Sequence, residues 1–178
     1  MAVRPIVLYP DPVLRRPALE VERFDAELGE LVRDLADTMY DAPGVGLAAP
    51  QVGVPLRVAV VDVASGSADS RLHVLVNPRL VESEGRVRGD EGCLSIPGLT
   101  EQVERPRRVR VSAFDPSGNR FDVEGEELFA RALCHEIDHL DGILFFERLA
   151  GLRKELALRR LRKLPYVTEA LAGAPQSS

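Results

Sequence analysis

The chain is poor in the residues that mark several classes of protein. Its 178 residues include no tryptophan, two cysteines and three histidines, and only 5% of them are aromatic. Two cysteines are too few for a disulfide-rich secreted domain, and no apolar run approaches the roughly 18 residues of a membrane span. The formal net charge of −5 argues against binding nucleic acid over the whole surface. We therefore expect no membrane association and no DNA partner.

The rest of the composition is that of an ordinary globular domain, with 45% hydrophobic and 29% charged residues. The length fits a single domain over residues 1–164, and the small and polar residues that follow predict a flexible tail over residues 165–178. The first residues lack the apolar run and the cleavage site of a secretory signal. We expect a monomeric protein of the cytoplasm.

Helical and strand patterns follow one another without an internal repeat. Apolar residues at helical spacing predict a helix over residues 25–41, with Asp25 as its N-cap. Strands are expected over residues 56–63, 72–76 (ending at Asn77-Pro78), 108–114 and 121–123, and further helices over residues 126–141 and 152–164. This order predicts an α+β fold with an N-terminal and a C-terminal helix.

The most informative segment is His135-Glu136-Ile137-Asp138-His139, in the second of these helices. Two histidines four residues apart lie on one face of a helix, so both imidazoles can reach the same metal ion. Glu136 then lies beside the ion, where it can move a proton without being a ligand. Because the apolar stripe of the helix runs through Phe129, Leu133, Ile137 and Leu140, we expect one side of it to face the core and the other to face the metal.

Two imidazoles leave a divalent ion short of protein ligands, so a third must come from elsewhere. Downstream, the nearest acidic candidates are Glu147 and Glu155, and a zincin-type metallopeptidase would use such a glutamate. Upstream, Cys93 follows Glu91 and Gly92, and a thiolate is a strong soft ligand. A buried structural thiol is the alternative for Cys93. A protein that binds metal and peptide termini without catalysis is the alternative for the whole site.

A third cluster is the segment from Gly44 to Gln51. Its two glycines can keep the loop backbone open for a peptide, and the amide of Gln51 can donate a hydrogen bond to an oxygen that develops charge. By itself the pattern is also that of a plain loop. Its meaning depends on the other two clusters.

Together the three clusters resemble the peptide deformylases. The matching residues are Gly44, Gly46, Ala48, Ala49 and Gln51, then Glu91 through Ser95, then His135, Glu136, Asp138 and His139. The segment from Val7 to Leu14 also looks like the start of that family, so the resemblance covers nearly the whole chain. It implies mixed or antiparallel sheets packed around a central metal-binding helix.

The resemblance implies a set of catalytic roles. Cys93, His135 and His139 would bind one divalent metal ion, expected to be Fe²⁺ in the cell, with Zn²⁺, Ni²⁺ or Co²⁺ in isolated protein. Hydroxide generated at the metal would attack the formyl group of an N-formylmethionyl peptide, and Glu136 would act as general base and then acid. The oxyanion would be held by the metal, the amide of Gln51 and the backbone N–H of Leu94.

The resemblance also implies how substrate and partners bind. The nascent peptide would pair with main chain near Val45, Gly46 and Gly92. The methionine pocket would be lined by Val45, Leu94, Leu128 and Ala132. Glu91 and Arg105 would form a structural ion pair. In two places the chain departs from common members: Thr100 replaces an arginine near the path of the peptide, and Cys134 replaces a glutamine and is expected to pack rather than bind metal.

The last predicted helix is strongly basic. Its cationic residues are Arg153, Lys154, Arg159, Arg160, Arg162 and Lys163. Such a helix on an acidic protein could contact the ribosome through its RNA, as in similar enzymes, or could simply be a solvated helix face.

Overall fold

The computed structural model describes residues 2–173 and has the expected α+β architecture. The helices are α1 (Ala26–Asp41), α2 (Glu127–Leu140), α3 (Gly151–Arg162) and α4 (Pro165–Ala172), with short 3₁₀ turns η1 (Pro12–Arg15), η2 (Ala49–Val52) and η3 (Phe145–Arg148). The strands are β1 (Gly46–Ala48), β2 (Val58–Val61), β3 (His73–Glu84), β4 (Val87–Gly92), β5 (Thr100–Arg105), β6 (Arg108–Phe114) and β7 (Arg120–Glu126). None of the helices in this described part is long and apolar enough to cross a membrane.

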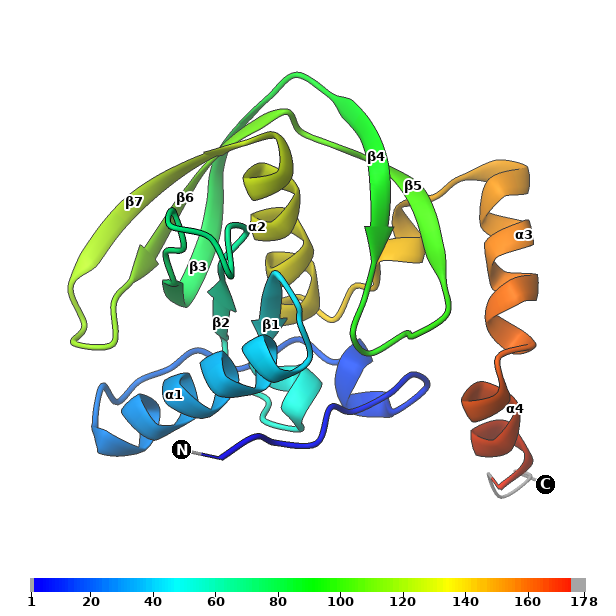
Figure 1. The fold of residues 1–178 in the computed structure, drawn as a ribbon, viewed down its shortest axis with the longest axis horizontal. Helices are drawn as coiled ribbons and strands as arrows, with labels where there is room; N and C mark the ends of the chain where they lie inside the picture. The colour runs from blue at the N-terminus through cyan, green and yellow to red at the C-terminus, as the bar shows by residue number, and fades with distance from the viewer. Residues whose placement is uncertain (1, 174–178) are drawn as a thin grey trace.

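Two antiparallel sheets surround α2. The larger sheet has the strand order β1-β2-β3-β6-β7, and the smaller sheet is the hairpin β4-β5. Figure 1 shows α2 between the two sheets, with α1 below β1 and β2 of the larger sheet and with α3 and α4 beyond β5. Strand β1 lies at the end of its sheet and β4 pairs only with β5, so each has one edge that carries no strand.

The N-terminal helix forms as its sequence predicts. The Asp25 side chain caps it by accepting a hydrogen bond from the N–H of Leu28. Its buried side includes Leu31, Leu35 and Met39, which pack in one cluster with residues of β1 and β2. Burial of this apolar stripe fixes α1 against the edge of the sheet from which the candidate peptide-binding loop emerges.

Helix α2 is more deeply buried than its apolar stripe predicts. All residues from Ala130 to Leu140 are buried, including both histidines. Leu133 and Ile137 pack into the cluster beneath the larger sheet, as expected, but the opposite side of the helix is covered by β4-β5. The polar side of the helix therefore lies in a second interior region rather than at an open surface.

The strand that begins at His73 continues to Glu84, so the predicted end of this strand at Asn77-Pro78 is wrong. The pairing of β3 with β6 shifts register between Val76 and Arg79, which is where the proline would otherwise interrupt the ladder. Asn77 adopts a positive φ of 50°, and its side-chain amide exchanges hydrogen bonds with the backbone of Val21 (2.8 and 2.9 Å). This bulge lets one long strand cross the proline.

The predicted flexible tail is wrong over Pro165–Ala172, because the structure has helix α4 there. Pro165 occupies the first turn of the helix, where its missing N–H costs nothing. Val167 of α4 is almost fully buried, in the cluster that contains Phe145 and Phe146. The expectation for residues 174–178 lies outside the described residues.

Candidate active site

A cavity of about 380 Å³ lies between the unpaired edges of β1 and β4. One wall is the segment from Pro43 to Gly46, the opposite wall runs from Asp90 to Thr100, and α2 forms the base. Every residue to which the sequence assigned a substrate role lines it: Val45, Gly46, Gly92, Leu94, Leu128 and Ala132. Gln51, Cys93, His135 and Glu136 reach the same cavity.

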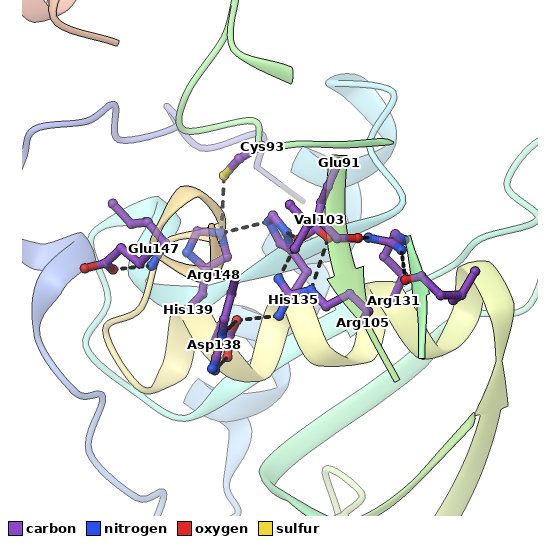
Figure 2. Close-up of polar contacts among 12 residues, drawn as sticks. Glu91, Cys93, Val103, Arg105, Arg131, His135, Asp138, His139, Glu147 and Arg148 are labelled. Carbon is purple, nitrogen blue, oxygen red and sulfur yellow. Dashed lines mark hydrogen bonds and ion pairs between the residues drawn. The ribbon is translucent and has the colours of Figure 1, made fainter. Parts of the chain in front are cut away.

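The three predicted metal ligands converge at one point. The Sγ atom of Cys93 lies 3.2 Å from Nε2 of His139, which lies 3.1 Å from Nε2 of His135. Cys93 comes from the loop after β4 and the histidines from α2, and Figure 2 shows the three side chains pointing toward one another. One thiolate and two imidazoles suit Zn²⁺, Fe²⁺, Co²⁺ or Ni²⁺, so these residues fit a single divalent ion.

The protonation of the histidines is set by their surroundings. Nδ1 of His135 lies 2.6 Å from a carboxylate oxygen of Glu91. Desolvation by burial raises the pKa of Glu91, but hydrogen bonds from His135 and Arg105 outweigh it and hold that pKa well below its ordinary value. Because the carboxylate is ionised, Nδ1 of His135 donates to it, and Nε2 is the atom that faces the other two ligands. Burial lowers the pKa of His139, which favours its neutral imidazole. Burial also acts to lower the pKa of His135, but hydrogen bonds with Cys93 and Glu91 outweigh it and raise that pKa, so a metal that binds Nε2 would displace a proton.

Glu91 is the centre of a buried network of charges (Figure 2). Arg105 binds it through two hydrogen bonds (2.5 and 3.1 Å), which confirms the predicted ion pair, and Arg131 adds a third of 2.9 Å. Arg105 also donates to Asp138 at 2.6 Å, and Arg148 binds both oxygens of that carboxylate (2.5 and 3.0 Å). The network thus links the β4-β5 hairpin to α2 directly behind the histidines.

The sequence interpretation missed two members of this network, Arg131 and Arg148. Arg131 also donates to the backbone oxygens of Val103 and Val87 (2.9 and 3.1 Å), so it connects both strands of the hairpin to α2. A signal was available, because Arg131 lies four residues before His135 on the same helix face. An arginine on a buried helix face requires a carboxylate partner.

Glu136 is buried beside the ligands and is 3% exposed. Desolvation by burial raises its pKa to about 7. Among the residues that the structure describes, no group bonds to its Oε2 atom. A carboxyl group with a pKa near neutrality and an oxygen free of protein partners can accept a proton and return it.

Gly46 allows this carboxylate to approach the loop. A methyl group at Gly46 would overlap Oε1 of Glu136 and lie 2.9 Å from its Cδ atom. We expect Gly46→Ala to lower kcat/KM for a formyl-Met peptide by about 10²-fold, because the displaced carboxylate of Glu136 would lose its alignment with the reacting atoms. Steady-state kinetics measure this effect, and Gly29→Ala in α1 is the control because a Cβ there meets its nearest neighbour at 3.6 Å. Equal activity of the two variants would show that the close approach is unimportant.

Gln51 is held in a defined orientation. Its Oε1 accepts a hydrogen bond of 2.9 Å from the N–H of Ala48, so its amide nitrogen points into the site. That nitrogen lies 3.1 Å from Oγ of Ser95 and 3.6 Å from Sγ of Cys93. Within the described residues, no protein group accepts the N–H of Leu94. Two donors therefore lie beside the metal ligands.

Glu147 and Glu155, the alternative metal ligands considered from the sequence, do not belong to the site. Glu147 accepts the N–H of Leu144 at 2.8 Å and pairs with Arg15 at 2.8 Å. Across residues 2–173, the cluster of potential ligands contains Cys93 and no downstream glutamate. Cys134 packs with Ile137 under the larger sheet, and burial raises its pKa to about 11, so it remains a packed thiol.

Comparison with known proteins agrees with this geometry. Residues 3–155 match the family model for polypeptide deformylase. The chain is 48% identical over 169 residues to a peptide deformylase of Acidobacterium capsulatum, covering 95% of this chain and 99% of the relative. It is 50% identical over 171 residues to one of Acidothermus cellulolyticus, covering 96% and 92%.

Solved structures give the same result. The peptide deformylase of Legionella pneumophila superimposes with a TM-score of 0.85 at 45% identity, over 98% of this chain and all (100%) of that one. The enzyme of Thermus thermophilus does so with a TM-score of 0.88 at 44% identity, over 97% and 100%. With the Cys93-His135-His139 site in place, these matches show that the chain belongs to the polypeptide deformylase family.

Proposed function

We propose that this chain removes the formyl group from the N-terminal methionine of new polypeptides and releases formate. The observation that carries the proposal is the convergence of Cys93, His135 and His139 on one point, beside a buried carboxyl group and inside a peptide-sized cavity. Three protein ligands leave a position open for catalysis. A divalent ion held there supplies Lewis acidity, which lowers the pKa of water and polarises a carbonyl group.

Glu136 moves the proton. Its carboxylate takes a proton from the attacking water and later delivers it to the departing amine of methionine, which becomes the free N-terminus. A pKa near 7 suits both steps, because the group is neither permanently protonated nor too weak a base at neutral pH. The absence of a side chain at Gly46 lets the carboxylate lie close against this wall of the cavity.

Gln51 and Leu94 stabilise the formyl oxygen as it gains charge. The Gln51 amide is preorganised by Ala48, so little energy is spent in orienting it during the reaction. The backbone N–H of Leu94 is adjacent in sequence to the ligand Cys93, and it provides a second donor from the opposite wall.

The substrate main chain adds to the edges of β1 and β4. Val45 lies directly before β1, Gly46 begins that strand and Gly92 ends β4, and an extended peptide between the two strands can bond to main chain on both sides. The methionine side chain enters the apolar part of the cavity, which Leu94, Leu128 and Ala132 line together with Val45. All groups come from one chain, so a monomer is sufficient.

We propose Fe²⁺ as the ion in the cytoplasm, where new formylated chains are made. The donor set accepts Zn²⁺, Co²⁺ and Ni²⁺ as well, so metal analysis after anaerobic purification decides the identity of the ion.

The function itself is tested by mixing the anaerobically purified protein with a formyl-Met peptide and measuring the formate that is released. Release of formate supports the proposal. Cleavage of internal peptide bonds without formate would indicate a metallopeptidase, and metal binding without either reaction would indicate a binding protein.

We propose that the basic helix α3 contacts ribosomal RNA. Arg153 donates to the backbone oxygen of Gln102 (2.6 Å) and Arg160 pairs with Glu101 (2.9 Å), so these two attach α3 to β5. Arg159, Arg162 and Lys163 are exposed, and they leave a cationic face for phosphate groups.

Charge reversal tests this contact. Arg159→Glu with Arg162→Glu should reduce co-sedimentation with ribosomes severalfold, because two phosphate contacts would be replaced by repulsion. Arg16→Glu with Arg23→Glu alters the net charge equally and should have little effect. Equal binding by both double variants and the wild type would refute the contact.

A further inference from the structure

Helix α4 is attached to the loop that follows the metal ligand Cys93. The hydroxyl of Tyr166 donates a hydrogen bond of 2.9 Å to the backbone oxygen of Pro97. Figure 1 places α4 next to α3, beyond the β4-β5 hairpin, with the connecting loop of that hairpin facing it. The segment that the sequence assigned to a tail thus reaches the wall of the active site.

Apolar packing reinforces this attachment. Val167 is 1% exposed and belongs to the same cluster as Ile96 and Leu99. Leu164 packs so closely on the loop that a Cβ at Gly98 would lie 3.1 Å from its Cδ2 atom. Gly98 also has a φ of 89°, so both its backbone conformation and this contact favour glycine.

The loop held by α4 forms one end of the cavity. Pro97, Gly98, Leu99 and Thr100 all line it, whereas Leu128 and Ala132 line the part assigned to methionine. If formyl-methionine occupies the metal and the apolar pocket, the residues that follow methionine must extend along the remaining wall. The loop from Pro97 to Thr100 is the part of that wall that α4 fixes.

We propose that α4 is part of the peptide-binding apparatus and that Tyr166 is a positioning residue for substrate residues beyond methionine. This inference rests on the proposed deformylase function. Tyr166 acts through the Pro97 carbonyl group, which it holds in place, and does not touch the reacting atoms. Loss of its hydroxyl therefore affects binding of long substrates and leaves the chemical step intact.

The test compares two hydroxyl deletions in α4 on two substrates. Tyr166→Phe removes the bond to Pro97, while Thr168→Val removes a hydroxyl that bonds only within the C-terminal segment, to the backbone oxygens of Arg162 and Leu164. For formyl-Met-Ala-Ala-Ala, Tyr166→Phe should raise KM about threefold to tenfold, the effect of one hydrogen bond, with kcat unchanged. For formyl-methionine amide, KM should stay the same, and Thr168→Val should change neither substrate.

A full-length Val167→Ala variant provides a second measurement, because it loosens the packing of α4 on the cluster that contains Ile96 and Leu99 and keeps the Tyr166 hydroxyl. It should show the same dependence of KM on substrate length. An equal loss on both substrates, or no change on either, would overturn the inference. Formate release from formyl-methionine amide by the wild type is independent of α4 in this scheme, so failure there refutes the deformylase function instead.

Discussion

Replacing Glu136 by glutamine should lower kcat for deformylation by about 10²- to 10⁴-fold while the metal content of the protein stays the same. The amide has the size of the carboxyl group but cannot accept the proton of water. It also cannot return a proton to the departing amine. Because Glu136 is not among the convergent ligands, its replacement leaves Cys93, His135 and His139 in place. Formate release under saturating peptide, together with metal analysis, measures both quantities.

Two companion variants separate the competing mechanisms. Glu155→Gln should change neither activity nor metal content, because Glu155 is exposed on α3, outside the ligand cluster. The metallopeptidase hypothesis requires the opposite result. Cys93→Ala should lose metal and activity together. Full activity of Cys93→Ala, or loss of metal from Glu136→Gln, would contradict the assignment of roles.

Replacing Glu91 by glutamine should lower the free energy of unfolding by about 3–5 kcal/mol. Glu91 is 6% exposed and is the shared acceptor of Arg105, Arg131 and His135. Removing its charge leaves two guanidinium groups buried with incomplete compensation, which costs more than the pair itself contributes. Urea unfolding of the metal-free and metal-loaded protein measures the change.

The same substitution should weaken metal binding by about 10- to 100-fold, because Glu91 orients His135 and raises the basicity of its Nε2 atom. Glu104→Gln is the matched control: its partner Arg86 lies at 2.9 Å, but both side chains are exposed, so the cost should stay below about 1 kcal/mol. If the two substitutions lowered the free energy of unfolding by similar amounts, burial of the network would not contribute to stability.

The pH dependence of this contribution follows from the direction of the shift. The folded-state pKa of Glu91 lies below its ordinary value of roughly 4.3. Its stabilising effect is therefore complete above the unfolded pKa and is lost only as the pH falls toward the folded one. Glu91→Gln should reduce stability at neutral pH and have progressively less effect in strong acid.

The residues that converge in the candidate site were predictable because they belong to short motifs. His135, Glu136 and His139 are fixed relative to one another by one helical turn, and the resemblance supplied Cys93 and Gln51. The network behind them was only partly predictable. Helical spacing places Arg131 on the face of His135, but Arg131 and Arg148 meet carboxylates 40 and 10 residues away in sequence, and local spacing does not identify those partners.

The missed elements lacked the patterns on which sequence prediction depends. Strand β4, Val-Arg-Gly-Asp-Glu-Gly, has one apolar residue, because it forms a hairpin that contacts the core mainly through polar groups. Strand β1 has only three residues. Helix α4 buries little more than Val167, and its small residues suggested disorder. In each case tertiary contacts, rather than local preference, determine the structure.

The two strand edges beside the cavity also bear on solubility. Exposed edges invite pairing with other chains and are a common source of aggregation. Strand β1 offers only three residues, and β4 offers six that include Arg88 and Asp90, charged residues of the kind that discourage pairing at an exposed edge. A chain terminus anchored at the metal would gain from that anchor the affinity that these edges do not supply. The edges would thus let the enzyme accept many different chain starts while it avoids aggregating with its own copies.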